Sequence, residues 1–367
     1  MLFPYKRIPH AMEKMHEFIE FIFQNVWCNA PNVDYSIDLF EGNDSLHKVM
    51  DHLDREDQAG KLKETGAGAF FLTHVNEIFN EFKRLQPAEI TQYRLQFDQN
   101  NKIEDLCQNA PESLRTQYES LNPAKTTLNE KIETFFKQLY SSGFFDLKFV
   151  KDEVGSTIGE YYRDFVRRDN GNDNDVCPFC GLLPIDGEFD PTREAFDHYL
   201  PKGKYPFNSV NLANLCPSCN KCNSGNKLEQ DPLHDRNGIR RPAFYPFSDV
   251  QPDIAISISV NVTDWTRPLP ENFVVSITSH SHVVETRTWS EMFRITKRYA
   301  AKCCSKGGGD YWKKKVLDEC QNYERSPGQM ARAEITTAKS SPWYEANFLK
   351  AAFLEGFERK GVFAELV

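Results

Sequence analysis

The sequence lacks a long hydrophobic run, an excess of positive charge and an apolar stretch at its start. No apolar segment approaches the roughly 18 residues of a membrane-spanning helix, so we expect no membrane association. The opening residues, MLFPYKRIPHAMEKMHE, become charged too early for a secretory signal, which makes the cytoplasm the expected location. The net charge of −9 argues against a protein that coats nucleic acid through bulk charge. The hydrophobic content of 40% is still enough for a folded core.

The charge is unevenly distributed along the chain. Residues 1–170 contain 20 Lys+Arg against 28 Asp+Glu, a net charge of −8. Residues 191–245 contain 8 against 5, a net of +3, and residues 283–316 contain 9 against 3, a net of +6. We therefore expect a polyanion to bind behind the middle of the chain. Four basic residues in the last range have helical spacing and form either a second candidate phosphate-binding surface or a solvated face: Arg294, Lys297, Arg298 and Lys302.

Apolar periodicity and composition divide the chain into three predicted domains. Residues 1–168 show helical spacing and are expected to form a scaffold or a docking domain. Residues 169–250 are rich in Cys, Pro, Gly and Asn, which is typical of a small domain held together by metal. Residues 251–367 begin with two alternating β-branched runs, 253–262 and 273–279, that predict a hairpin before a helical end. The predicted fold class is α+β, mostly helical, with a small β segment.

Cysteine spacing predicts a structural metal site. Cys177 and Cys180 form one CxxC pair, and Cys219 and Cys222 form another. Two such pairs supply four thiolates, the set that tetrahedral Zn²⁺ prefers; the alternative is a metal-free cluster of buried thiols. Cys216 adds a second register, because it also forms a CxxC with Cys219.

The segment between the two pairs, AFDHYLPKGKYPFNSVNLANL, contains an acid–imidazole pair. Asp197 is suited to hold a hard cation such as Mg²⁺ or Mn²⁺ through oxygen. His198, with an ordinary pKa near about 6.5, is suited to accept a proton from water. An isolated Asp-His is ordinarily a surface or capping pair. Its place between two zinc half-sites favours catalysis.

The order CPFCG, DH, NL and CNKCN resembles the HNH (ββα-metal) endonuclease motif in its zinc-stabilised form. The resemblance implies that Asp197 and His198 end the first strand of a ββα finger and that His198 is the general base. It implies that Asn214 braces the loop and fixes the His198 ring. It also places Asn223 at the third position, as a ligand of the catalytic ion beside Asp197. Since that position holds Asn, the chain resembles an HNN variant.

The resemblance also bears on the zinc register. In the family the middle Asn lies five residues before the second CxxC and the third residue follows it, as Asn214 and Asn223 do around the pair 219/222. The register 216/219 has the same internal spacing with Asn211 and Asn220, so the sequence itself leaves both open.

Three lysines flank the motif and are candidate substrate contacts to phosphate, with ordinary solvated charge as the alternative: Lys202, Lys204 and Lys227.

A narrower similarity extends these expectations to partners. The stretches FDHYLPKGKYP, NLCPSCNKCNSGNK and RRPAFYPFSDV resemble the HNH subunits of Septu-type bacterial anti-phage systems. This resemblance implies a nuclease acting on nucleic acid, with DNA favoured, beside an SMC-like or ABC-type ATPase. The competing interpretation is a zinc-ribbon module that binds nucleic acid or protein without catalysis. The Asp-His pair favours the nuclease, since a ribbon has no need of it.

Overall fold

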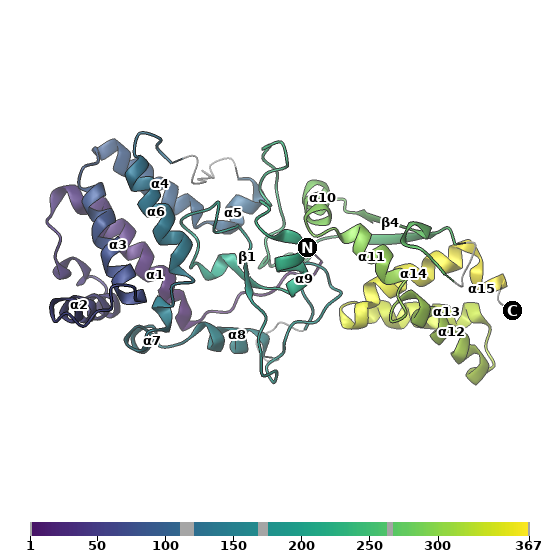
Figure 1. Ribbon diagram of the computed structural model, residues 1–367. Helices are drawn as coiled ribbons and strands as arrows, with labels where there is room; N and C mark the ends of the chain where they lie inside the picture. The colour runs from purple at the N-terminus through teal and green to yellow at the C-terminus, as the bar shows by residue number, and fades with distance from the viewer. Residues whose placement is uncertain (1, 111–120, 168–174, 263–266, 366–367) are drawn as a thin grey trace.

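The computed structural model describes residues 2–110, 121–167, 175–262 and 267–365. The molecule is elongated, with one group of helices at each end and the cysteine-rich segment between them (Figure 1). The mostly helical α+β character expected from the sequence is confirmed. Among the helices of these ranges, none is both long and apolar enough to cross a bilayer.

The N-terminal group packs around a core of aromatic and aliphatic side chains. Its longer helices each bury one face; α2, for example, buries Leu46, Val49, Met50 and Leu53. This helix begins after Asn43, whose side chain accepts a hydrogen bond from the Leu46 N–H at 3.0 Å. The helices are α1 (Lys14–Phe21), α2 (Asp44–Gln58), α3 (Ala67–Phe82), α4 (Pro87–Asn100), α5 (Ile103–Gln108), α6 (Thr126–Leu139), α7 (Lys148–Val154) and α8 (Ile158–Val166).

The cysteine-rich segment contains two short strands followed by a short helix. Strand β1 (Phe196–His198) pairs antiparallel with β2 (Leu215–Pro217), and α9 (Asn220–Cys222) follows and continues into a wider turn over Asn223–Lys227. The register sets Asp197 opposite Cys216. Strands of three residues cannot form a core of their own, so this unit depends on its surroundings.

The C-terminal part begins with the predicted hairpin, which is confirmed. Strands β3 (Ala255–Val260) and β4 (Phe273–Thr278) pair antiparallel, and β3 packs against the last long helix. The helices are α10 (Val283–Met292), α11 (Ile295–Cys303), α12 (Gly309–Tyr323), α13 (Pro327–Ser340), α14 (Asn347–Lys360) and α15 (Val362–Glu365).

One aromatic side chain joins the cysteine-rich segment to the N-terminal helices. Phe207 is fully buried, and its ring lies 5.3 Å from Phe23, 5.5 Å from Phe97 and 5.4 Å from Phe136, between ring centroids. The chain that follows β1 is thus inserted into the core of the helical group. That core therefore fixes where the loop between β1 and β2 runs.

This insertion gives a first prediction. Replacing Phe207 with Ala removes a buried ring and should lower the free energy of unfolding by about 3–5 kcal/mol. Urea unfolding followed by circular dichroism measures the loss. Phe189→Ala is the matched control, because Phe189 is 86% exposed and should change stability by about 0.5 kcal/mol or less. Similar losses for the two variants would contradict the shared core.

Candidate active site and metal centre

Four cysteines meet in the middle of the molecule. The Sγ atoms of Cys177, Cys180, Cys219 and Cys222 all lie within 4.8 Å of one another, and all four residues are buried. No disulfide links them. Cys216 lies outside this cluster, on β2, where its Sγ faces the Pro217 carbonyl at 3.5 Å. The predicted pairing of 177/180 with 219/222 is confirmed, and four buried thiols this close together fit a structural ion such as Zn²⁺.

The first knuckle depends on Gly181. Its N–H donates to the Cys177 carbonyl at 2.8 Å, and its φ of +62° is in the left-handed region that favours glycine. A Cβ at this position would lie 2.8 Å from side-chain atoms of both Leu2 and Phe348. Residues from the two ends of the chain therefore close over the turn that presents the first two thiols.

Helices α10 and α11 close the cluster from another side. Trp289 Nε1 donates to the Phe179 carbonyl at 2.6 Å, Tyr299 Oη donates to the Cys180 carbonyl at 2.9 Å, and Arg298 Nη1 lies 3.2 Å from Cys222 Sγ. The predicted basic stripe on this helix is therefore not one free face. Arg298 is turned towards the thiols, where its positive charge stabilises thiolate ligands.

Asp197, His198 and Asn223 line a single cavity of about 260 Å³ beside the metal centre. Although neighbouring residues on a strand usually point to opposite faces, Asp197 and His198 lie at the end of β1 and both border this cavity. The remaining lining residues are Phe196, Pro201, Lys202, Ser224, Lys227, Leu228 and Glu229. The sequence-predicted acid, imidazole and carboxamide are thus brought together.

The His198 ring is held in one orientation. Its Nε2 donates to the Ser209 carbonyl at 2.9 Å, and the Tyr140 ring packs edge-on at 4.8 Å. Burial lowers the pKa of His198 to about 3, and the nearby charges of Lys202 and Lys227 add to the effect while the Ser209 hydrogen bond opposes it. The imidazole is therefore neutral at pH 7, with Nδ1 as its acceptor nitrogen.

Asn214 braces the loop, as the resemblance implied, but it does not touch the His198 ring. Its Oδ1 accepts from the Leu200 N–H at 2.7 Å, and its Nδ2 donates to the Leu200 carbonyl at 3.0 Å and to Asn208 Oδ1 at 2.9 Å. The predicted ring contact is supplied instead by the Ser209 carbonyl, one residue after Asn208. Every residue has a backbone carbonyl, so the residue type at position 209 could not indicate this contact with His198.

Asp197 forms a buried ion pair that the sequence did not predict. Lys227 Nζ lies 2.9 Å from Asp197 Oδ1 and donates to the His198 carbonyl at 2.7 Å, and the two side chains are 1% and 4% exposed. Burial raises the pKa of Asp197, and the Lys227 ammonium partly reverses this. Asp197 Oδ2 is buried and has no hydrogen-bond partner. The sequence had predicted that Lys227 contacts phosphate, with solvated charge as the alternative. Both interpretations are corrected, because Lys227 is buried and stabilises the site from within.

The other two lysine candidates, Lys202 and Lys204, line two different cavities. Lys202 lines the His198 cavity, with its Nζ 5.8 Å from the centre of the Tyr140 ring. Lys204 lines a neighbouring, larger cavity. Sequence reasoning missed Glu229, an exposed carboxylate that borders the His198 cavity, because nothing in its local pattern distinguishes it from solvated charge.

Comparisons with protein-family models, with curated proteins and with solved structures found no match for this chain. The chemistry of the site must therefore be argued from the residues that it brings together.

The metal centre makes a testable distinction between two adjacent cysteines. Cys219→Ala removes one of four ligands and should abolish stoichiometric zinc binding and lower the thermal midpoint, because ligand binding is part of the folding free energy. Cys216→Ala should keep one zinc per chain. Elemental analysis of the purified proteins measures the metal. Zinc retained in Cys219→Ala and lost in Cys216→Ala would reverse the assignment.

The buried ion pair gives a prediction for stability. Lys227→Met leaves the Asp197 carboxylate buried without a partner and should cost about 3–5 kcal/mol of unfolding free energy. Adding Asp197→Leu removes the uncompensated charge and should recover most of the loss. Denaturant titrations give both values, and Lys221→Met, an exposed lysine on α9, is the control with little expected effect. A Lys227→Met protein as stable as the wild type would refute the pair's role.

Proposed function

We propose that the protein is a metal-dependent HNH-type endonuclease that hydrolyses phosphodiester bonds of nucleic acid, with DNA as the favoured substrate. One observation carries the proposal: an oriented, neutral His198 shares a cavity with Asp197 and Asn223 beside a four-thiol metal centre. The order strand, strand, helix, with the Asp-His pair ending the first strand, agrees with the resemblance seen in the sequence. A binding ribbon has no need of such an imidazole.

In this proposal His198 activates the attacking water. Its Nε2–H is committed to the Ser209 carbonyl, so Nδ1 accepts the proton of a water molecule as the water oxygen attacks phosphorus. The P–O3′ bond breaks, and the leaving 3′-oxygen takes a proton from solvent. The low pKa keeps the base unprotonated before substrate binds. A bound phosphodiester adds negative charge beside the ring and raises that pKa during reaction.

The oxygen donors of the cavity fit a hard divalent cation. Asp197 Oδ2 is a buried oxygen without a hydrogen-bond partner, and Asn223 and Glu229 border the same space. When bound there, Mg²⁺ or Mn²⁺ supplies positive charge that stabilises the transition state of phosphoryl transfer. Asp197 and Asn223 would hold this ion. Lys227 keeps Asp197 in place and offsets part of its negative charge.

The Septu-type resemblance adds a partner to the proposal. The acidic N-terminal part, with its net charge of −8 over residues 1–170, repels nucleic acid and suits a protein surface. We place the SMC-like or ABC-type ATPase on this side of the molecule. The N-terminal helices lie at one end of the elongated molecule, which supports this placement of the partner (Figure 1).

The decisive experiment is plasmid nicking in the presence of Mg²⁺ or Mn²⁺. His198→Ala removes the general base and should lower the cleavage rate by about 10²–10⁴-fold. The variant should keep its zinc, because the cysteine cluster is untouched.

His280→Ala is the matched control, since His280 is exposed and lies outside the cavity. It should cut at the wild-type rate. A His198→Ala protein that cleaves as fast as this control would exclude His198 as the base. A wild-type protein that is loaded with zinc and still inert on DNA and RNA would exclude the nuclease itself.

A further inference from the structure

A second and larger cavity adjoins the proposed catalytic one. It has a volume of about 870 Å³, against about 260 Å³ for the cavity of His198. Two chain segments separate them. Lys202 borders the small cavity and Lys204 the large one; Glu229 borders the small cavity and Gln230 and Asp231 the large one. The two cavities therefore border the same two stretches of chain.

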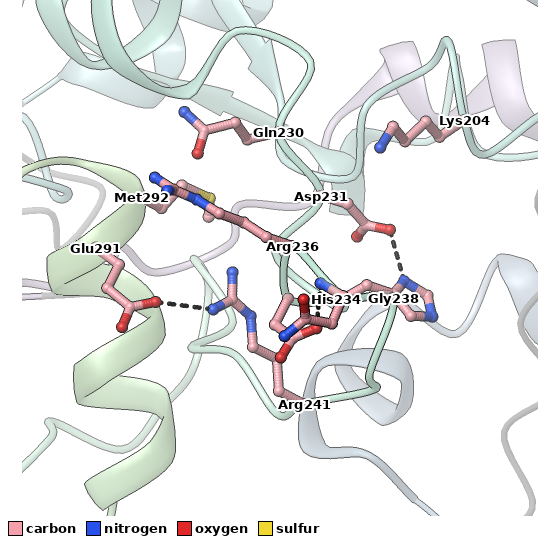
Figure 2. Close-up of a pocket in the computed structure, with 11 residues that line it drawn as sticks. Lys204, Gln230, Asp231, His234, Arg236, Gly238, Arg241, Glu291 and Met292 are labelled. Carbon is pink, nitrogen blue, oxygen red and sulfur yellow. Dashed lines mark hydrogen bonds and ion pairs between the residues drawn. The ribbon is translucent and has the colours of Figure 1, made fainter.

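The walls of this cavity are polar and fixed. Tyr205 Oη donates to Asp231 at 2.9 Å, His234 Nδ1 donates to Asp231 Oδ2 at 2.6 Å, and Asp231 Oδ1 accepts from the Leu233 N–H at 2.8 Å. Figure 2 shows the Asp231–His234 contact on one side and the ion pair of Arg241 with Glu291 on the other. Asp231 is only 7% exposed, so the network forms a rigid floor.

Three carboxylates and three basic side chains line the cavity: Asp231, Asp235 and Glu291 against Lys204, Arg236 and Arg241. Each carboxylate already accepts hydrogen bonds or forms an ion pair within the protein. Asp235 Oδ1 accepts from the N–H groups of Asn237 and Ile239, both at 2.8 Å, and Glu291 pairs with Arg241 at 3.1 Å. In the described part of the chain, Lys204 and Arg236 make no side-chain hydrogen bond or ion pair. These two cations are therefore the groups of the lining that are available to an anionic ligand.

The lining identifies the ligand class. Its side chains are almost all charged or polar, with Met292 the one large apolar side chain among the residues that border it. Small-molecule sites are mostly apolar, whereas surfaces for nucleic acid are polar and wet and contact phosphates through Lys and Arg. We propose that this cavity is a strand-binding subsite: it holds the phosphodiester backbone next to the bond cut at His198, with Lys204 and Arg236 as phosphate contacts. This inference rests on the proposed nuclease function.

The test measures binding apart from cleavage. Zinc-loaded, full-length protein carrying His198→Ala is titrated with a fluorescein-labelled DNA duplex, and anisotropy is read between about 50 and 200 mM NaCl. Lys204→Ala and Arg236→Ala are then added together. Each lost phosphate contact should reduce the slope of log K against log salt by about 1 and weaken binding roughly 8-fold at 0.1 M salt.

The matched control removes two exposed lysines from the turn between α2 and α3, Lys61→Ala with Lys63→Ala. It changes net charge equally and should alter neither the affinity nor the slope. Equal affinity and slope in the two double variants would overturn the subsite. So would displacement of the duplex by inorganic phosphate at constant ionic strength, which would indicate a site for a free anion.

Cleavage by protein with an intact His198 is followed in parallel on the same duplex. Normal cutting together with unaltered binding by the Lys204/Arg236 variant would reject the subsite and leave the nuclease standing. A wild-type protein that neither binds nor cuts would reject both.

Discussion

Convergence of four thiols from two distant turns is the constraint on which the central unit depends. Cys180 and Cys219 are separated by 38 residues, yet their sulfur atoms lie 3.9 Å apart. The chain between them contains two strands of three residues each, too little for a core of its own. A metal ion held by these four thiols would close that chain into a loop with fixed ends. The end of β1, where the acid and the imidazole lie, then has a defined position relative to the helix that follows.

The helical group at the N-terminus completes the site, although it contributes no reacting residue in the proposed mechanism. Phe207 anchors the loop in the aromatic core, and two residues later the Ser209 carbonyl meets His198 Nε2. Asn208 and Asn214 hold the intervening backbone. Buried side chains from all three predicted domains belong to one hydrophobic cluster. Ring orientation at the site is thus coupled to packing in helices far away in the sequence.

Short-range sequence patterns predicted the features that depend on residues close together in the chain. Apolar periodicity located the helical parts, alternation of β-branched residues located the β3–β4 hairpin, and CxxC spacing located the thiol cluster. The contacts that tune the site escaped prediction, because each joins groups that are distant in sequence. Lys227 lies 30 residues from Asp197, and Arg298 lies 76 residues from Cys222. A lysine in a polar segment is ordinarily solvated, so its burial follows only from the fold.

In the proposed nuclease, the arrangement of charge would allow one small cavity to hold a carboxylate and still admit a phosphodiester. An unpaired Asp197 would repel the substrate and would favour protonation of the neighbouring imidazole. Lys227 cancels much of that charge through Oδ1 and leaves Oδ2 without a hydrogen bond. Within the described part of the chain, Lys202, Lys204 and Arg236 border the two cavities without a side-chain hydrogen bond or ion pair. In the proposed nuclease these cations would contact the phosphates of the strand, while the Asp197–Lys227 pair leaves little net charge beside His198.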